Sequence, residues 1–342
     1  MTELPKDGSA GLLVLGGRDI AGITDVAELI GVAREALRKT SDLTAVQDVR
    51  RVLDLEEPGG ACLSVMYAAI ADLPLFGAKV LSVLPQNFAR GLPSHRGGIL
   101  LFERDCGTPV AIVDGGQTTA WRTAAASAVA TQCLSRENSS VLTLMGYGEQ
   151  AERHVVALSA IRPIREIRVW GRDPEKAEAF ADKQRAAGFD AKGCDDAQTA
   201  VAGADIVCTV TSARTPILSG EWLTPGTHVN AVGASVPSIR ELDDACVTRS
   251  GIWVDYMPMA LTSAGEIVEA IRDGLISKDH LKGEIGAVIN GAIPGRTSDD
   301  QITLYRSLGV PAQDIEFANF FYAVARSKGL GATVPFEDLN HA

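Results

Sequence analysis

The sequence of 342 residues lacks any pair of cysteines at C-x-x-C spacing, and its five histidines are dispersed. A zinc knuckle requires ligands that close together, so we expect no metal site. Six cysteines scattered along so long a chain do not form the framework of a small disulfide-rich protein. We therefore expect reduced thiols and a cytoplasmic protein.

Long apolar runs are also missing. The first apolar segment, Leu12 to Leu15, is far shorter than the ~20 residues of a membrane-spanning helix. The polar tail before it, Met1 to Ala10, lacks the basic segment and apolar run of a secretory leader. The net charge of −11 would repel nucleic acids and anionic membranes. The sequence therefore predicts neither as a partner and leaves small molecules as ligands.

What the chain does have is a globular composition, with 46% hydrophobic and 22% charged residues, and a length sufficient for two domains. Its first third is typical of short strands joined by turns such as Glu57 to Gly60, which favours antiparallel pairing. One helix, ending at Leu37, interrupts them. The expected strands are Leu12 to Leu15, Val46 to Leu55, Ala61 to Met66, Phe76 to Leu84, Gly98 to Phe102 and Thr108 to Val113.

The middle of the chain has a different pattern. After an alanine-rich helix from Gln117 to Leu134, residues 141–154 run from a buried strand through a glycine turn into a second helix. Gly146 permits the tight turn, and Gly148 lets a pyrophosphate approach the backbone. A second strand, Glu166 to Trp170, completes a βαβ unit of the length that dinucleotide binding requires. The segment therefore predicts a phosphate site at a helix N-terminus.

Three further apolar segments repeat the strand pattern, which predicts a doubly wound parallel sheet. Ligands bind beyond the carboxyl ends of the strands in such a sheet, and these ends are marked here by Gly146, Arg172, Thr211 and the turn Gly233 to Ser235. The segments are Asp205 to Val210, His228 to Gly233 and Gly251 to Tyr256, with helices at Pro174 to Ala187, Ala264 to Asp273 and Asp314 to Lys328. The expected fold is an α/β Rossmann domain joined to a strand-rich α+β domain.

The second strand of the βαβ unit ends in Gly171-Arg172-Asp173. An NAD site usually places a carboxylate here for the ribose hydroxyls, whereas an NADP site has a nearby arginine for the 2′-phosphate. Arg172 therefore favours NADP, unless it is an ordinary exposed charge. Asp173 can face either the ribose or solvent.

Four basic residues outside the nucleotide-binding domain have apolar neighbours, namely Arg50, Arg51, Lys79 and Arg122. Beside a nicotinamide, arginine suits bidentate binding of a substrate carboxylate, and lysine supplies a charge or a proton. Taken singly, each residue is more typical of a solvated surface charge. Their spacing in the sequence does not bring them together.

Several motifs in one order resemble the ornithine cyclodeaminase/mu-crystallin family over residues 12–325. They lie at 77–80, 94–103, 121–128, 146–151 with His154, 230–235 and 296–303. The resemblance implies a homodimer whose substrate-binding and dimerisation domain comprises residues 1–125 and 317–342. Residues 126–316 would form the inserted Rossmann domain.

The resemblance also implies which residues form the site. Arg50, Lys79 and Arg122 would surround the carboxylate of an imino or amino acid, and Ser235 would bridge the substrate and the nicotinamide ring. The cofactor, NADPH or NADH, would be lined by Thr123, Gly146, Gly148, Glu149, Gln150, Arg172, Thr211, Val232, Ser235 and Thr303.

Three positions depart from the family pattern. Ser235 and Ser64 stand where the cyclodeaminase branch has carboxylates, which would hold the second amine of ornithine. Cyclodeamination is therefore disfavoured, and Ser235 is similar to the ketimine reductase branch. Tyr67 replaces the usual proline of a Met-Pro-Ala motif, so we expect a substrate pocket of different size.

The leading hypothesis is NAD(P)H-dependent reduction of an imino acid, such as Δ1-pyrroline-2-carboxylate or Δ1-piperideine-2-carboxylate. Arg50 and Arg122 would hold the carboxylate, while Lys79 would stabilise its charge and assist protonation. One alternative is ornithine or lysine cyclodeamination, or an alanine dehydrogenase-like oxidation of an amino acid. The other is a non-catalytic, crystallin-like protein that binds NADPH.

Overall fold

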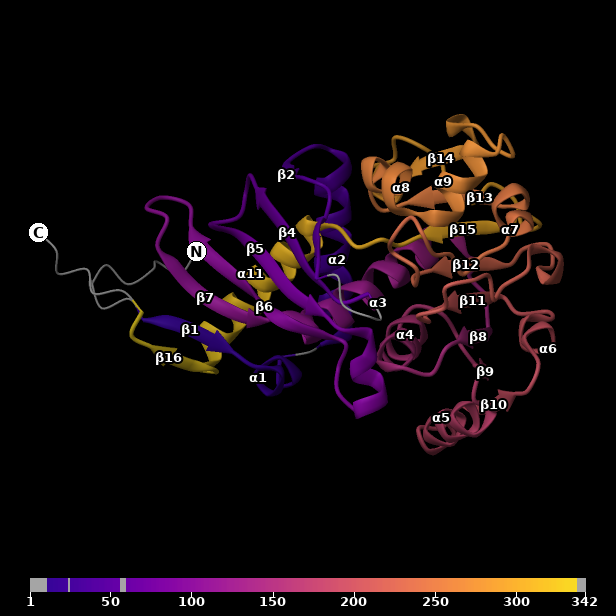
Figure 1. Ribbon diagram of the computed structural model, residues 1–342, viewed down its shortest axis with the longest axis horizontal. Coiled ribbons are helices and arrows are strands. Elements are labelled where there is room, and N and C mark those ends of the chain that lie inside the picture. Colours follow the sequence, from indigo (N-terminus) through magenta and orange to yellow (C-terminus); the bar gives the residue numbers. More distant parts are fainter. Residues whose placement is uncertain (1–10, 24, 56–59, 337–342) are drawn as a thin grey trace, which may run out of the picture. The chain divides into compact units, whose positions relative to one another are not determined.

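The computed structural model describes residues 11–23, 25–55 and 60–336 (Figure 1). The expected tail and the residues Glu57 to Gly59 of the expected turn lie outside this description. The chain divides into two compact units. The first contains Met1–Val32, Leu43–Arg122 and Val310–Ala342, and the second contains Ala33–Asp42 and Thr123–Gly309. Most of the second unit is thus a single insertion into the first.

The first unit is built on a mixed sheet. Its strands are β1 (Leu12–Leu15), β2 (Ala45–Gln47), β3 (Arg51–Asp54), β4 (Cys62–Ile70), β5 (Leu75–Val83), β6 (His95–Glu103), β7 (Pro109–Asp114) and β16 (Ala332–Val334). They follow the order β16-β1-β7-β6-β5-β4-β2, with β3 also paired to β4. The neighbours from β7 to β2 are antiparallel, as their short turns predict, whereas β1 is parallel to β7. The expected strand Val46 to Leu55 is broken between β2 and β3, and the break contains Arg50.

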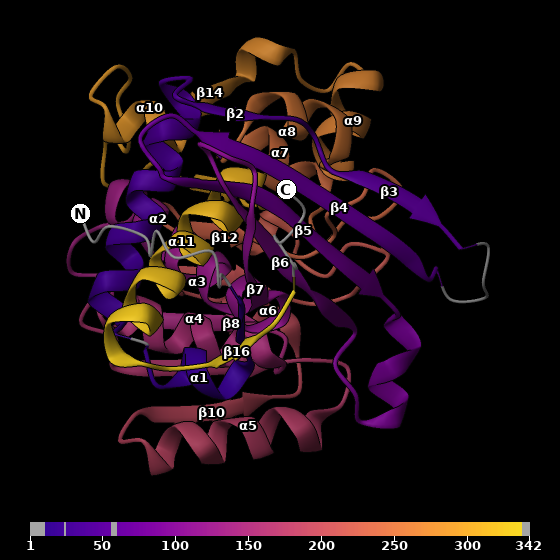
Figure 2. The ribbon, with the colours of Figure 1, turned by 90° about the vertical axis from the view of Figure 1, so that its left-hand side faces the viewer.

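Four helices accompany this sheet in the described part of the chain, and two of them also contribute residues to the second unit. They are α1 (Gly17–Ala21), α2 (Val26–Ser41), α3 (Gly115–Leu134) and α11 (Pro311–Lys328). Because side chains alternate along a strand, the sheet has an inner face that includes buried Lys79 and, beside it on the neighbouring strands, Met66 and Ile99. Helix α11 packs along β4 and β5 of this sheet (Figure 2).

The second unit contains a sheet whose neighbouring strands are all parallel among the described residues. Its strands are β8 (Val141–Met145), β9 (Glu166–Trp170), β10 (Asp190–Cys194), β11 (Ile206–Thr209), β12 (His228–Ala231), β13 (Gly251–Val254), β14 (Leu281–Glu284) and β15 (Thr303–Arg306). The order β10-β9-β8-β11-β12-β15-β13-β14 is visible in Figure 1. The order in which strands are added reverses at β8, since β9 and β10 lie on one side of it and β11 and β12 on the other. The sheet is therefore doubly wound, and the predicted Rossmann fold is confirmed.

The helices of this unit connect the strands. They are α4 (Glu149–Ser159), α5 (Pro174–Ala186), α6 (Ala197–Val201), α7 (Asp244–Arg249), α8 (Met257–Ser263), α9 (Gly265–Arg272) and α10 (Ile285–Ile289). In the described residues, no helix of either unit combines the length and apolarity needed to cross a bilayer.

One strand in the middle of this sheet was not expected from sequence pattern. Strand β15 lies between β12 and β13, and all four of its residues are buried. Its sequence, Thr-Leu-Tyr-Arg, is short and ends in a charge, whereas buried parallel strands usually show as continuous apolar runs. The burial of Arg306 at its carboxyl end therefore required a partner that only the fold supplies.

Candidate functional site

The turn after β8 is shaped by glycines. Gly146 has a φ of +123°, which L side chains rarely adopt, and a side chain there would approach the Val210 carbonyl oxygen. Gly148 precedes helix α4 with φ −90°, and a Cβ atom at this position would have no neighbour within 4 Å. The start of α4 is therefore open to a ligand beside Gly148. A pyrophosphate fits there, because a helix N-terminus presents free N–H groups and positive potential.

The end of β9 presents an exposed arginine and a carboxylate that caps a helix. Asp173 caps α5, since its Oδ1 accepts a hydrogen bond from the Lys176 amide at 3.2 Å and its Oδ2 lies 3.3 Å from Lys176 Nζ. Hydrogen bonding by the Lys176 amide lowers the pKa of Asp173. The side chain of Arg172, by contrast, is exposed. Of the two charges at this strand end, Arg172 is the one available to a ligand.

Two loops at the carboxyl edge of the sheet are joined by a buried carboxylate. Glu241 Oε1 accepts hydrogen bonds from the Thr211 amide at 2.8 Å and the Thr211 hydroxyl at 2.5 Å. Burial raises the pKa of Glu241, and these bonds from Thr211 oppose the shift. Gly233, in the turn after β12, lies so close to Glu241 Oε2 that a Cβ atom would be 2.4 Å away. The Glu241 carboxylate thus fills the space that a side chain at position 233 would need.

The same turn contains the half-buried side chains of Val232 and Ser235. Between them, Ala234 has a left-handed φ of +59°, a conformation that costs a non-glycine residue about 1–2 kcal/mol. The remaining predicted cofactor residues lie nearer the helices. Thr123 is buried in α3, and Glu149 and Gln150 begin α4, where Gln150 Oε1 is buried without a hydrogen-bond partner in the described structure.

Thr303 lies where the parallel strands of this sheet begin, opposite to their carboxyl ends. It begins β15 and pairs with His228 at the start of β12, whereas Arg306 pairs with Ala231 at the carboxyl end. The Thr303 hydroxyl is buried, and it donates to the Leu134 carbonyl at 2.8 Å. The structure therefore does not bring Thr303 to the edge that contains Gly146. The residue of this strand that reaches that edge is Arg306.

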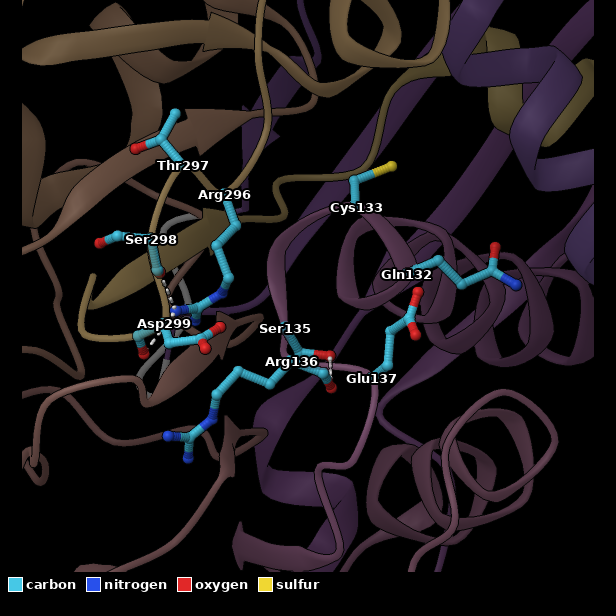
Figure 3. A pocket seen from close by; sticks show the side chains of 9 residues that line it. All are labelled: Gln132, Cys133, Ser135, Arg136, Glu137, Arg296, Thr297, Ser298 and Asp299. Atoms are coloured by element: carbon cyan, nitrogen blue, oxygen red, sulfur yellow. Dashed lines mark hydrogen bonds between the residues drawn. The ribbon is translucent and has the colours of Figure 1, made fainter.

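A polar hollow of about 350 Å³ lies at the edge where β15 begins (Figure 3). Arg296 lines it, and its guanidinium donates to the carbonyls of Leu134, Gly226 and Gln301 and to the Thr303 hydroxyl, at 2.7–3.1 Å. These bonds use its donors within the protein. Arg296 therefore acts as a structural clamp for the start of β15.

The first unit contains a buried ionic cluster on the inner face of its sheet. Lys79 Nζ donates to Asp314 Oδ1 at 2.7 Å and to the Thr119 hydroxyl at 3.2 Å. Both charged side chains are almost fully buried. Burial lowers the pKa of Lys79 to about 7, although the Asp314 carboxylate opposes that shift. A lysine with this pKa exchanges a proton readily near neutral pH.

Two arginines accompany this lysine. Arg122 is buried in α3, with Nε 3.4 Å from Asp314 Oδ1 and Nη1 3.2 Å from Gln313 Oε1. Arg50 is half-buried between β2 and β3, and its charge contributes to lowering the pKa of Lys79. Arg51 points elsewhere, since it is exposed and pairs with Asp48 at 2.5 Å. Of the four basic residues singled out in the sequence, three gather and Arg51 stays at the surface.

The strand register determines on which face of the sheet Ser64 and Tyr67 lie. Ser64 is buried on the same face of β4 as Met66, which pairs with Lys79. Tyr67 faces the opposite side, where it is 42% exposed and donates to Asp48 Oδ2 at 3.0 Å. Tyr67 therefore does not face the Lys79 cluster, because neighbouring residues of a strand point to opposite faces, and its effect on the size of the substrate pocket stays a prediction.

Sequence reasoning missed Asp314 and Glu241 as members of these clusters. Asp314 stands near the start of an expected helix, where a carboxylate ordinarily serves as a partner of the helix dipole. Glu241 follows an irregular segment with no pattern of its own. No local signal distinguishes either residue from a surface carboxylate, because their partners are distant in the sequence.

The family model of ornithine cyclodeaminase/mu-crystallin proteins matches residues 13–329. The chain belongs to this family. Over 327 residues it is 33% identical to a Delta(1)-pyrroline-2-carboxylate reductase of Bacillus cereus, with 95% of this chain and 100% of that protein covered. Over 284 residues it is 37% identical to the ketimine reductase mu-crystallin of Mus musculus, with 83% and 87% covered. The resemblance inferred from the motifs is confirmed.

Solved structures of similar proteins agree with the fold. Delta(1)-pyrroline-2-carboxylate reductase of Thermococcus litoralis, in complex with NADH and L-proline, aligns with a TM-score of 0.91 and 31% identity, covering 94% of this chain and all of that one. An archaeal alanine dehydrogenase dimer with bound NAD aligns with a TM-score of 0.89 and 31% identity, covering 95% and 99%. The α/β architecture with its Rossmann sheet is thus shared over nearly the whole chain.

Proposed function

We propose that this family member is an NAD(P)H-dependent reductase of imino acids, acting on a ketimine such as Δ1-pyrroline-2-carboxylate or Δ1-piperideine-2-carboxylate. The observation that carries the proposal is the buried Lys79, whose pKa is about 7. Reductases of such compounds are among the relatives that match most of the chain. A ketimine needs a proton on its nitrogen as well as a hydride on its carbon, and Lys79 is suited to supply the proton.

The charge of the cluster suits a carboxylate substrate. Arg50, Lys79 and Arg122 contribute up to three positive charges, and within the cluster Asp314 contributes one negative charge. Buried cations are costly unless they are paired, so an anion is favoured there. Arg122 and Arg50 bind the substrate carboxylate, because guanidinium groups match its two oxygens.

Lys79 acts on the substrate nitrogen. The bound reduced nicotinamide supplies a hydride when present. The ammonium group of Lys79 gives its proton to the nitrogen of the C=N bond, so that one C–H and one N–H bond form. Asp314 holds Nζ in place through its 2.7 Å contact. Lys79 then regains a proton from solvent, and its pKa near 7 leaves part of it protonated at neutral pH.

The cofactor is proposed to bind at the carboxyl edge of the second sheet. Gly146, Gly148 and the first residues of α4 receive the pyrophosphate, while Thr211, Val232 and Ser235 line the remainder. Arg172 binds the 2′-phosphate, since its side chain is exposed and Asp173 is used in capping α5. This assignment favours NADPH over NADH.

We also propose a homodimer formed through the outer face of the first sheet. Tyr67, Ala78, Leu100 and Ile112 form a row across four neighbouring strands, and Val80 lies on the same face. Tyr67, Val80 and Ile112 are 42%, 41% and 37% exposed. A hollow of about 540 Å³, lined by Val46, Tyr67, Phe76 and Phe102 among others, adjoins them. A continuous apolar sheet face of this kind is typical of a protein interface, and a second copy supplies the same surface.

A cytoplasmic location is the remaining part of the proposal. The structure records all six cysteines as free thiols. Unpaired thiols are typical of a reducing compartment.

The test is oxidation of NADPH and NADH by the purified protein with a panel of cyclic and acyclic imino acids. Turnover of a cyclic ketimine with a carboxylate, and none with its ester, is the expected result. Ammonia release from ornithine or lysine would instead support cyclodeamination. Tight cofactor binding without turnover of any compound would support the crystallin-like alternative.

A further inference from the structure

A second buried ionic cluster lies beneath the turn after β12. Arg306, the last residue of β15, is 1% exposed and forms an ion pair through Nε with Glu266, which is 2% exposed and stands in the first turn of α9. Neither residue belongs to the sequence motifs from which the function was inferred. Burying an ion pair is costly, so we look for its role in the hydrogen bonds that Arg306 forms.

The bonds of Arg306 lead to the backbone of the turn. Nη1 donates to the Ala231 carbonyl at 2.9 Å, and Nη2 donates to the Ala234 carbonyl at 2.5 Å. These two carbonyls flank Val232 and Gly233. The planar guanidinium therefore fixes the separation of the two ends of the turn, which a single ammonium group cannot do.

The conformation of the turn requires such support. Ala234 has a left-handed φ, and this backbone conformation is unfavourable for a non-glycine residue unless neighbouring contacts hold it. On another side, Glu241 lies against Gly233 and holds Thr211 through two hydrogen bonds. Buried charged groups thus contact the turn from two directions.

We propose that Arg306 is a positioning residue that holds residues 231–235 in the conformation that presents Val232 and Ser235, and that Glu266 orients its guanidinium. The proposal rests on the proposed function only for the consequence that cofactor binding depends on Arg306. The effect on the turn itself is independent of what the protein reduces.

The experiment compares Arg306→Lys with Arg296→Lys. Both substitutions replace a guanidinium bonded to backbone carbonyls, and they lie at opposite ends of β15. Arg296 lines the hollow of Figure 3, which lies at the end of β15 away from the turn. A general loss of stability therefore affects both variants, whereas loss of turn geometry affects Arg306→Lys alone.

Three readouts are measured on the folded fraction of each variant. In Arg306→Lys, amide hydrogen exchange across residues 231–235 increases about 10-fold or more, equivalent to the loss of ~1.4 kcal/mol of local stability. The Kd for NADPH rises and kcat falls by a similar factor. In Arg296→Lys, the melting temperature falls, while exchange in the turn, Kd and kcat stay within about 2-fold.

Unchanged exchange in the turn of a folded Arg306→Lys variant would overturn the proposal, and so would an equal increase in both variants. If Arg306→Lys does not fold, Glu266→Gln replaces it, because the variant keeps the carbonyl bonds and removes only the charge that orients the guanidinium. It is expected to increase exchange in the same residues to a smaller extent. If the wild type reduces no imine, the proposed function fails, yet the exchange result still decides the role of Arg306.

Discussion

The carboxylate of Asp314 lies 2.7 Å from the ammonium group of Lys79, although the two residues are 235 positions apart in the sequence. Both side chains are buried, so their charges interact with little screening by solvent. The contact raises the pKa of Lys79 against the larger opposing effect of burial. Asp314 therefore increases the fraction of Lys79 that is protonated near neutral pH.

Asp314→Asn is expected to shift the pH dependence of imine reduction. Protonated Lys79 is the proton donor, so kcat/KM falls as the pH rises through its pKa of about 7. Removing the carboxylate lowers that pKa further, and the alkaline limb moves to lower pH by about one unit or more. The measurement is a profile of kcat/KM against pH. Asp205→Asn, which disturbs an ion pair with Arg136 in the other unit, should leave the limb in place.

Arg122→Lys is expected to weaken substrate binding. Lysine keeps the charge but cannot bind a carboxylate through two parallel hydrogen bonds, so the KM for the imino acid rises about 10-fold, or ~1.4 kcal/mol. The Kd for NADPH should change little. Arg51→Lys serves as the control, because Arg51 is exposed and pairs with Asp48. Equal effects of the two substitutions would contradict the role given to Arg122.

Gly148→Ala is expected to fold normally and to bind cofactor weakly. A Cβ atom at Gly148 meets no neighbour within 4 Å, so the protein accommodates it without strain. A methyl group would nevertheless stand where a pyrophosphate approaches the start of α4, raising the Kd for NADPH by about 10-fold or more. Thermal unfolding and cofactor titration separate the two effects. Gly31→Ala, at another open position, should leave the Kd unchanged.

Arg172→Asp is expected to reverse the cofactor preference. The substitution removes the charge proposed to bind the 2′-phosphate and adds one that repels it, so kcat/KM with NADPH falls about 10-fold or more relative to NADH. Arg165→Asp makes the same charge change before the other end of β9, and it should preserve the wild-type ratio. A wild type that already prefers NADH would refute the assignment of Arg172.

Val80→Asp is expected to dissociate the dimer. A charge beside the apolar row on the outer sheet face would be desolvated on association, which costs several kcal/mol. Light scattering after size exclusion should show the mass of one chain for the variant and of two for the wild type. Leu275→Asp changes an exposed apolar residue of the other unit and should remain dimeric. A monomeric wild type would remove the proposal.

The sequence predicted much of the second unit and less of its site. Strands such as Val141–Met145 and Ile206–Thr209 are apolar runs beside glycine or turn residues, so local pattern identified them. Strand β15 was not predicted from the sequence, because its burial depends on the ion pair of Arg306. The motif containing Thr303 supported the family resemblance, but the strand direction puts that residue at the opposite edge from Gly146. A motif marks a segment without saying which end of it meets a ligand.

By itself, the sequence determined the α/β architecture and the glycine turn, because these depend on residue types at short, regular spacing, and the order of its motifs determined the family by resemblance. The tertiary structure alone decided that Lys79 meets Asp314, that Tyr67 faces away from Lys79, and that Arg306 lies under the turn after β12. Those contacts follow from strand register and helix packing between residues far apart in the chain. Local spacing contains no information about them, since the same side chains would serve equally well at the surface of another fold.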